Sequence, residues 1–178
     1  MATIAESKEE SIKEEAKDNS DIKIYTDGSG FKGSVGAAAV LYRKGVKEPE
    51  KILRFHLGSL KKHTTFEGEA VGSILATWML QGQPEAGQSK ITNYTDSQAF
   101  IKATGARKSG PGQYLVTEYL SLTEAMHNST NVPCPIGTAK FTLKWVAAHE
   151  GVTGNERVDK EVKRAAQGES SLLEDYQT

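Results

Sequence analysis

The tripeptide Tyr-Thr-Asp occurs twice in the chain, each time at the end of a segment whose β-branched and aromatic residues predict a strand. The first segment spans 22–27 and is followed by Gly28, and the second spans 90–96 and is followed by a helical stretch. In open α/β sheets, ligands bind at the carboxyl ends of the strands. If the two strands are parallel neighbours, about 4.8 Å apart, Asp27 and Asp96 lie together at one edge of the sheet. Two carboxylates that close together require a cation or a proton between them.

The other predicted elements indicate one mixed sheet with helices packed against it. Short connections, including a glycine-rich turn over 28–36, join three strands into an antiparallel meander. Later segments alternate between helical periodicity and short strands, which implies two further strands reached by helical crossovers. The last helix is expected to begin with a capping box formed by Thr153 and Glu156. Strands are expected at 22–27, 37–42, 51–57, 90–95 and 141–146, and helices at 65–81, 97–104, 113–127 and 153–167.

The length of 178 residues suggests a single folded domain. We expect a flexible leader at 1–20, a folded domain at 21–168 and a flexible tail at 169–178, because both ends are polar. The leader has three lysines against six acids, and residues 168–178 have three acids and no base. Residues 21–167 then hold 19 basic and 14 acidic residues, a net charge of +5. This permits nucleic-acid binding without demonstrating it, since so small an excess is common on other surfaces.

The composition indicates a soluble protein of a reducing compartment inside the cell, cytoplasmic or nuclear. Cys134 is the only cysteine, which excludes an intrachain disulfide and a cysteine-rich metal site. No apolar run approaches the roughly 18 residues that a membrane span needs. The chain does not open with the charged and apolar regions of a signal peptide. We therefore expect no membrane partner.

Two further acids are candidates for the same edge of the sheet. Glu69 lies in the first turn of the predicted helix at 65–81, and Asp159 lies in the last helix. Three or four carboxylates without a cluster of Cys or His suit hard, oxygen-seeking cations, which favours magnesium or manganese over zinc. Two such ions, about 3.5–4 Å apart, can hold a phosphodiester, activate water and stabilise the departing 3′ oxygen. Phosphodiester hydrolysis is therefore the chemistry that fits best.

Each of these acids also has a purely structural interpretation. Asp27 can cap a turn through its own side chain, and Asp96 can be the N-cap of the helix that follows it. Glu67 is two residues from Glu69 and is equally acceptable by its position in the first helical turn. Spacing alone leaves the choice between Glu67 and Glu69 open.

Four segments, in order along the chain, resemble the motifs of type 1 ribonuclease H, and in particular those of the ribonuclease H domain of retroelement reverse transcriptases. The resemblance extends from about residue 21 to residue 167 and depends on all four motifs, because a lone Asp-Gly-Ser carries little information. The motifs are Tyr-Thr-Asp-Gly-Ser at 25–29, Glu-Gly-Glu-Ala at 67–70, Tyr-Thr-Asp-Ser-Gln at 94–98, and Trp-Val-Ala-Ala-His-Glu-Gly-Val-Thr-Gly-Asn-Glu-Arg-Val-Asp at 145–159.

The resemblance implies a ribonuclease H-like α/β fold with a five-stranded mixed sheet of strand order 3-2-1-4-5, flanked by helices. It also implies an endonuclease that cuts the RNA strand of RNA–DNA hybrids with two Mg²⁺ ions, for which Mn²⁺ can substitute. The four implied metal ligands are catalytic acids, and the implied histidine assists the nucleophile or product release. These catalytic residues are Asp27, Glu69, Asp96, Asp159 and His149.

The implied partner is an RNA–DNA hybrid, alone or together with the polymerase part of a reverse transcriptase, and the isolated domain is expected to be a monomer. Recognition of RNA requires contacts with 2′-hydroxyl groups in the shallow minor groove of the hybrid. The resemblance assigns such contacts to Gly28, Ser29 and Gln98. Arg107 and Lys108, in a later loop, are expected to bind phosphates.

The sequence departs from bacterial members of this family at two places. Thr65-Phe66-Glu67 stands where those members have adjacent asparagines, and a short loop at 107–112 replaces their basic protrusion. One alternative function is a catalytically silent nucleic-acid-binding module of a larger reverse transcriptase. Another is a DNA nuclease such as a transposase or resolvase core, although these lack the Thr-Gly-Asn-Glu-Arg-Val-Asp motif. The complete set of four acids and one histidine favours the nuclease that acts on hybrids.

Overall fold

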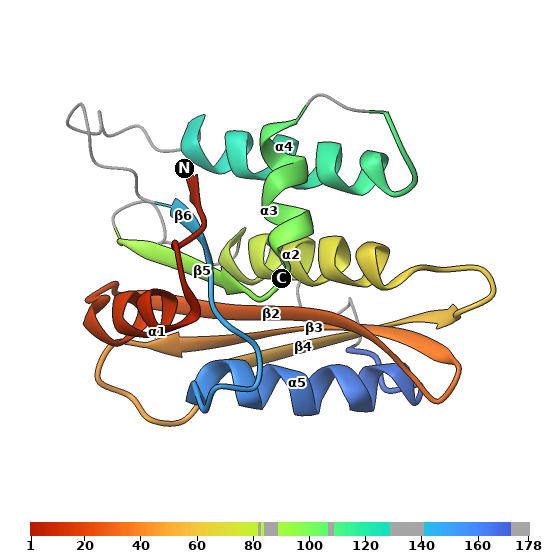
Figure 1. The fold of residues 1–178 in the computed structure, drawn as a ribbon, viewed down its shortest axis with the longest axis horizontal. Helices are drawn as coiled ribbons and strands as arrows, with labels where there is room; N and C mark the ends of the chain where they lie inside the picture. The colour runs from red at the N-terminus through yellow and green to blue at the C-terminus, as the bar shows by residue number, and fades with distance from the viewer. Residues whose placement is uncertain (82, 84–88, 107–108, 129–140, 172–178) are drawn as a thin grey trace.

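The computed structural model describes residues 1–81, 83, 89–106, 109–128 and 141–171. Within these residues the chain forms a mixed sheet with helices on both faces (Figure 1). The strands are β1 (Ala2–Thr3), β2 (Ile22–Phe31), β3 (Ser34–Arg43), β4 (Lys51–Ser59), β5 (Ile91–Thr95) and β6 (Phe141–Trp145). The helices are α1 (Lys8–Lys17), α2 (Thr65–Gln81), α3 (Gln98–Gly105), α4 (Gln113–Asn128) and α5 (Thr153–Ala166).

The strand order in the sheet is β1-β6-β5-β2-β3-β4. Strand β2 is antiparallel to β3 and parallel to β5. Apart from β1, this is the order that the resemblance implies, with β2 and β5 as the adjacent first and fourth strands. The expected count of five strands is wrong by one, because Ala2 and Thr3 pair with Leu143 and Lys144 at the edge of the sheet. Two residues are too few to show strand periodicity in a sequence.

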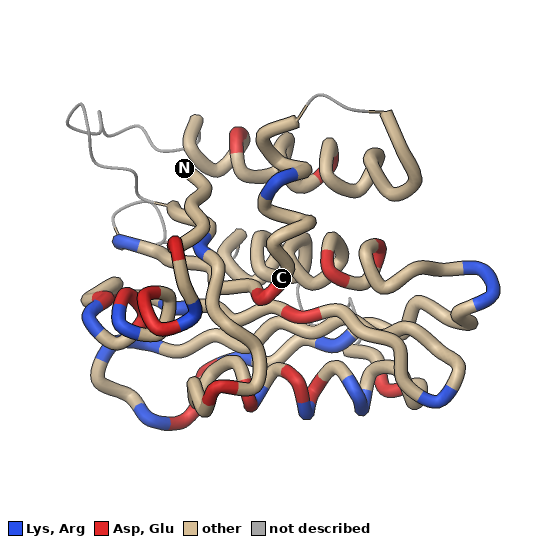
Figure 2. The backbone as a smooth tube through the Cα atoms, viewed as in Figure 1, with Lys and Arg blue, Asp and Glu red and all other residues tan. Residues whose placement is uncertain are grey.

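The first twenty residues include a strand and a helix, which contradicts the flexible leader that we expected. Helix α1 begins after Ser7, whose hydroxyl accepts a hydrogen bond from the Glu10 N–H at 3.1 Å. The helix lies beside the end of the sheet where β2 begins (Figure 1), and it is dense in acidic and basic residues (Figure 2). Its one buried residue is Ser11. Low apolar content predicted a flexible segment, but polar contacts largely hold this helix in place.

Part of the expected flexible tail also contacts the sheet. The hydroxyl of Ser171 accepts a hydrogen bond from the Arg54 N–H at 3.0 Å, and the hydroxyl of Ser170 accepts one from the His56 N–H at 2.8 Å. These contacts occupy backbone donors on the edge strand β4. Residues 172–178 lie outside the described part of the chain.

The glycine-rich stretch after Asp27 is a strand and not the long turn that we expected. Strand β2 continues to Phe31 and β3 begins at Ser34. The connection is a two-residue hairpin turn in which Lys32 and Gly33 both have positive φ, of 49° and 82°. Such primed turns match the twist of the flanking strands and favour glycine. Asp27 therefore lies within a long hairpin strand.

Apolar side chains fill both faces of the sheet. One core contains residues such as Ile24, Ile74 and Phe100 and lies under α2, α3 and α4. The other contains Tyr25 and Val158 and lies under α5. Helices α2 and α5 are thereby fixed on opposite faces (Figure 1). None of the described helices is both long enough and apolar enough to cross a membrane.

Candidate active site

Three of the predicted acids converge in the structure. Asp27 lies on β2, Asp96 directly follows β5, and Glu69 is the fifth residue of α2. One carboxylate oxygen from each residue lies within 4.8 Å of the other two. Strands β2 and β5 are parallel and in register, which brings the two aspartates to the same end of the sheet. The convergence that the two Tyr-Thr-Asp segments predict is therefore present.

The backbone at Gly28 explains how Glu69 reaches Asp27. A Cβ atom at position 28 would lie 1.9 Å from the carbonyl carbon of Gly68 and 2.0 Å from the nitrogen of Glu69. Both contacts are with backbone, so a side chain here would push α2 away from β2. The glycine lets the first turn of α2 lie directly on the strand. Glu69, which directly follows this turn, thereby reaches the cluster.

The structure distinguishes Glu69 from its neighbour Glu67. The Glu67 N–H donates to the Thr64 hydroxyl at 3.1 Å, and the Thr64 N–H donates to Glu67 Oε2 at 2.7 Å. This reciprocal pair is a capping box at the start of α2. Glu67 is thus engaged in capping, whereas Glu69 belongs to the acidic cluster. The Thr-x-x-Glu pattern at 64–67 is the sequence signal for this box.

The capping box that we expected at Thr153 and Glu156 is wrong. Helix α5 has Val152 as its N-cap, and no side chain forms a capping hydrogen bond there. Thr153 is already the first helical residue, so its hydroxyl is one position too late for a cap. The predicted start of the helix is nevertheless correct.

Asp96 is not the N-cap of α3. That position is taken by Ser97, whose hydroxyl accepts a hydrogen bond from the Phe100 N–H at 3.1 Å. The Ser97 N–H in turn donates to the Thr95 hydroxyl at 3.2 Å. The structural alternative for Asp96 is therefore excluded, and its carboxylate contributes to the cluster.

Burial and mutual repulsion raise the pKa values of the clustered acids. Burial, followed by the charges of Asp96 and Asp159, raises the pKa of Asp27 to about 7. Burial and the charges of Asp27 and Asp96 hold the pKa of Glu69 well above its usual range. Burial also raises the pKa of Asp96, although the nearby His149 opposes this shift. Without a cation the cluster retains protons that ordinary carboxyl groups would lose.

One oxygen of the cluster has no partner in the described structure. Glu69 Oε2 is buried and forms no hydrogen bond with any of the described residues. A buried carboxylate oxygen without a donor is unfavourable unless a proton or a cation completes the site. Together with an all-oxygen donor set, this observation fits a hard divalent cation such as Mg²⁺.

Asp159 lies beside the cluster and not within it. Its carboxylate forms an ion pair with Lys163, one helical turn later, at 2.7 Å, and its side chain is 22% exposed. Its charge still raises the pKa values of Asp27 and Asp96, as expected for a near neighbour. The structure thus brings three of the four predicted acids together and places the fourth next to them.

His149 lies in the loop between β6 and α5, on the side of the cluster that Asp96 occupies. The loop leaves β6 beside Asp96, because the Val146 N–H donates to the Thr95 carbonyl at 3.0 Å and Trp145 Nε1 donates to the Asp96 carbonyl at 3.2 Å. His149 is exposed and has a left-handed backbone conformation, with φ of 56°. Sequence patterns alone gave no reason to select it, and only the motif resemblance did.

The predicted substrate contacts are partly located. Gly28 and Ser29 follow Asp27 on β2, and Gln98, the first residue of α3, is two positions after Asp96. All three therefore adjoin the acidic cluster along the chain. Arg107 and Lys108 lie outside the described residues.

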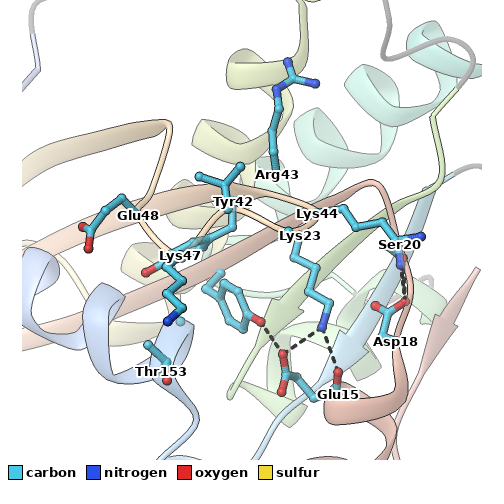
Figure 3. Close-up of a pocket in the computed structure, with 14 residues that line it drawn as sticks. Glu15, Asp18, Ser20, Lys23, Tyr42, Arg43, Lys44, Lys47, Glu48 and Thr153 are labelled. Carbon is cyan, nitrogen blue, oxygen red and sulfur yellow. Dashed lines mark hydrogen bonds and ion pairs between the residues drawn. The ribbon is translucent and has the colours of Figure 1, made fainter.

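A separate pocket of about 670 Å³ lies beside α1 and the start of α5 (Figure 3). Its lining includes Glu15, Lys23, Tyr42, Lys47 and Thr153 and none of the clustered acids. Cationic and anionic side chains face each other across it. A divalent cation requires converging carboxylates, so the acidic cluster, and not this pocket, is the candidate active site.

The sheet order and the three clustered carboxylates define a protein of the ribonuclease H-like α/β class. The family model described as RNase H matches residues 19–167. The chain belongs to the ribonuclease H family. Comparison with curated protein sequences gives no match.

Solved structures share this fold at low sequence identity. One is LC11-RNase H1, isolated from compost, in complex with an RNA/DNA hybrid; it has a TM-score of 0.59 and 16% identity over 82% of this chain and 96% of that chain. The N-terminal ribonuclease H domain of a Mycobacterium tuberculosis protein has a TM-score of 0.59 and 16% identity over 82% and 93%. The prototype foamy virus protease-reverse transcriptase has a TM-score of 0.58 and 17% identity over 83% of this chain and 21% of that chain. At these identities the likeness shows the fold.

Proposed function

We propose that this protein is an endonuclease that hydrolyses the RNA strand of RNA–DNA hybrids at the cluster formed by Asp27, Glu69 and Asp96. The observation that carries the proposal is the convergence of the three carboxylates within 4.8 Å around a buried oxygen without a partner. Membership of the ribonuclease H family supports it. So does the likeness to a ribonuclease H1 that is in complex with an RNA/DNA hybrid.

The donor set fits two magnesium ions, with manganese as a substitute. Asp27, Glu69, Asp96 and Asp159 would hold them, since hard divalent cations prefer carboxylate oxygens. When bound, a pair of such ions polarises the phosphodiester, activates water and stabilises the departing 3′ oxygen. The raised pKa values of the three clustered acids support this role, because a cation replaces the protons that they retain.

The chain's own residues have four tasks in this proposal. The clustered acids would hold the cations that position the scissile phosphate, and an imidazole nitrogen of His149 exchanges a proton with the attacking water or the leaving product. Gly28, Ser29 and Gln98 lie next to the acids in the chain and contact the ribose 2′-hydroxyl groups, which distinguish RNA from DNA. The remaining proposed contacts with phosphate are those of Arg107 and Lys108.

The motif resemblance also supports a retroelement origin, in which the polymerase part of a reverse transcriptase is a further partner. The likeness to the foamy virus protease-reverse transcriptase is consistent with this. We propose that the isolated domain acts as a monomer.

A cleavage assay with four labelled substrates tests the proposal. The substrates are an RNA–DNA hybrid, single-stranded RNA, duplex RNA and duplex DNA, each with and without Mg²⁺. Only the hybrid should be cut, in its RNA strand and only with the cation. Asp27→Asn should reduce the rate by roughly 10³-fold, because a ligand that stabilises transition-state charge is lost. The matched control is Glu67→Gln, which removes a charge from the first turn of α2 and retains the capping oxygen.

Three results contradict the proposal in different ways. Cleavage that survives Asp27→Asn removes the proposed site. Hybrid binding without any cleavage favours the catalytically silent module, and cleavage of duplex DNA favours a nuclease of the transposase or resolvase kind.

A further inference from the structure

Helix α1 holds the loop that carries His149 on both sides of the histidine. Ser11 is fully buried; its hydroxyl donates to the Lys8 carbonyl at 2.7 Å and accepts from the Ala147 N–H at 3.2 Å. The Lys8 ammonium group lies 3.1 Å from Glu150 Oε1. The backbone two residues before His149 and the side chain one residue after it are therefore both attached to α1.

The same N-terminal segment contacts β2 and β5 at their Tyr-Thr-Asp segments. The Tyr25 hydroxyl donates to the Glu15 carboxylate. The Lys23 ammonium group donates to the Glu15 carbonyl at 2.8 Å (Figure 3). The Tyr94 hydroxyl donates to Asp18 Oδ2 at 2.7 Å. Each tyrosine is two residues before an aspartate of the cluster. The segment thus fixes β2, β5 and the His149 loop relative to one another.

Strand β1 extends this attachment to β6, the strand that leads into the loop. The Leu143 N–H donates to the Met1 carbonyl at 2.9 Å, and Ala2 and Thr3 pair in parallel with β6. The Lys144 ammonium group also lies 3.8 Å from Glu14 Oε2. The loop therefore begins from a strand whose outer edge is held by the first residues of the chain.

The contacts with α1 flank a residue with an unfavourable backbone conformation, His149. A residue other than glycine in the left-handed region, here with φ of 56°, keeps that conformation only when its surroundings enforce it. The contacts that hold the flanking residues Ala147 and Glu150 both come from the N-terminal helix α1. They are polar and directional, so they specify an orientation more closely than apolar packing would.

We propose that residues 1–18 are a positioning element of the nuclease site, in which Ser11 and Lys8 hold the loop so that His149 faces Asp96. The inference rests on the proposed function. Ser11 and Lys8 are positioning residues that do not touch the substrate. Their contribution is expected in the turnover rate and not in the affinity for the hybrid.

Substitutions in the full chain test this role. Ser11→Ala removes the acceptor for the Ala147 N–H and should lower kcat by about 10-fold, with KM for the hybrid within about twofold, because small displacements of a reacting group slow the chemistry strongly. Lys8→Glu places two like charges together and should lower kcat by about threefold, and the swapped pair Lys8→Glu with Glu150→Lys should restore it. Lys13→Glu, at an exposed position of the same helix, is the matched control and should have no such effect.

A double-mutant cycle distinguishes positioning from general destabilisation. If Ser11 acts through His149, then Ser11→Ala should have no further effect on kcat in a His149→Ala background. Amide hydrogen exchange supplies a readout that does not depend on activity. In Ser11→Ala the Ala147 amide should exchange faster by about 10-fold or more, while amides in β2 and β5 keep their wild-type rates.

The outcomes distinguish failure of the proposed function from failure of the positioning role alone. If the wild type does not cut the hybrid, the proposed function fails, and the positioning role fails with it. Suppose instead that the wild type cuts the hybrid and Asp27→Asn does not, so that the proposed function stands. The positioning role alone is then overturned if Ser11→Ala leaves kcat unchanged, or if Ser11→Ala lowers kcat by the same factor in the His149→Ala background as in the wild type. If Ser11→Ala does not fold, the charge swap decides, since a Lys8→Glu defect without restoration by Glu150→Lys also overturns it.

Discussion

Tyr25 and Tyr94 stack against each other, with ring centroids 5.3 Å apart and an angle of 18° between the ring planes. The two residues are register partners on the parallel strands β2 and β5. Each is followed by one threonine and then by an aspartate of the cluster. The register that stacks the rings therefore also sets Asp27 and Asp96 side by side. In each Tyr-Thr-Asp segment the tyrosine packs in the core and the aspartate belongs to the acidic cluster.

Removing the Tyr94 hydroxyl should destabilise the protein through Asp18. The Asp18 side chain is only 3% exposed and accepts from the Tyr94 hydroxyl at 2.7 Å. Burial raises the pKa of Asp18, but hydrogen bonds from Ser20, Tyr94 and Thr92 outweigh burial and lower the pKa to about 2. We expect Tyr94→Phe to lower the free energy of unfolding by about 1–2 kcal/mol at neutral pH, because a buried carboxylate loses a donor.

The pH dependence of this difference checks the assignment to Asp18. An acid with a lowered pKa stabilises the folded state above its unfolded pKa, and this contribution disappears as the pH falls through the folded pKa. The difference between wild type and Tyr94→Phe should therefore shrink between about pH 4 and about pH 2. Urea denaturation of both proteins over this range measures it. A difference that stays constant would mean that Asp18 is not the partner that matters.

The clustered acids should have the opposite effect on stability. Their pKa values are raised in the folded protein, that of Asp27 from 3.8 to about 7. The folded state then binds more protons than the unfolded state, so the free energy of unfolding of the metal-free protein decreases as the pH rises through this window. We expect a loss on the order of 2 kcal/mol between about pH 4 and pH 7, smaller in Asp27→Asn.

Magnesium should reverse this loss. A cation that binds the ionised acids stabilises only the folded state, so added Mg²⁺ should raise the melting temperature more at about pH 8 than at about pH 5. Thermal denaturation with EDTA or with Mg²⁺ measures both effects, and Asp27→Asn is the control. An equal shift at both pH values, or an equal shift in the variant, would show that the ion binds elsewhere.

Gly28 should tolerate no side chain. The Cβ of an alanine would meet the backbone of Gly68 and Glu69 at about 2 Å, and backbone cannot move aside as a flexible side chain can. We expect Gly28→Ala to lower the free energy of unfolding by about 3 kcal/mol or more and to abolish cleavage, since α2 must shift with Glu69. Gly110→Ala, where nothing lies within 4 Å of the added Cβ, is the control and should change stability by less than about 0.5 kcal/mol. Urea denaturation measures both.

Periodicity and motif order predicted the central part of this fold from the sequence. The alternation in β2 and β5 and the helical spacing of α2 and α4 are local signals, and four ordered motifs selected the acids. The sequence predicts a turn at Gly28 because glycine is typical both of turns and of close backbone approaches. In the structure Gly28 allows the close approach of α2 to β2, and the strand continues through this residue to Phe31.

Contacts between distant polar residues could not be predicted. Helix α1 is attached through pairs such as Ser11 with Ala147 and Tyr94 with Asp18, which are far apart in the sequence. Their side chains are of types that are mostly exposed and solvated, so the polar leader gave no sign of its contacts. The missed strand β1 has the same cause, because its pairing with β6 depends on a partner about 140 residues away.

The two neighbouring glutamates of α2 should respond to substitution in opposite ways. Glu67 caps the helix through its exchange of hydrogen bonds with Thr64, whereas Glu69 places a buried oxygen in the cluster. Glu67→Ala should lower the free energy of unfolding by about 1 kcal/mol, as the loss of a cap does, and leave cleavage within about twofold. Glu69→Gln should reduce cleavage roughly 10³-fold. It should also lessen the loss of metal-free stability as the pH rises, because a buried group whose charge repels Asp27 and Asp96 is removed. Urea denaturation and the hybrid cleavage assay on the same preparations separate the two roles. If Glu67→Ala lost cleavage and Glu69→Gln retained it, the catalytic role would belong to Glu67 and the proposed site would be wrong.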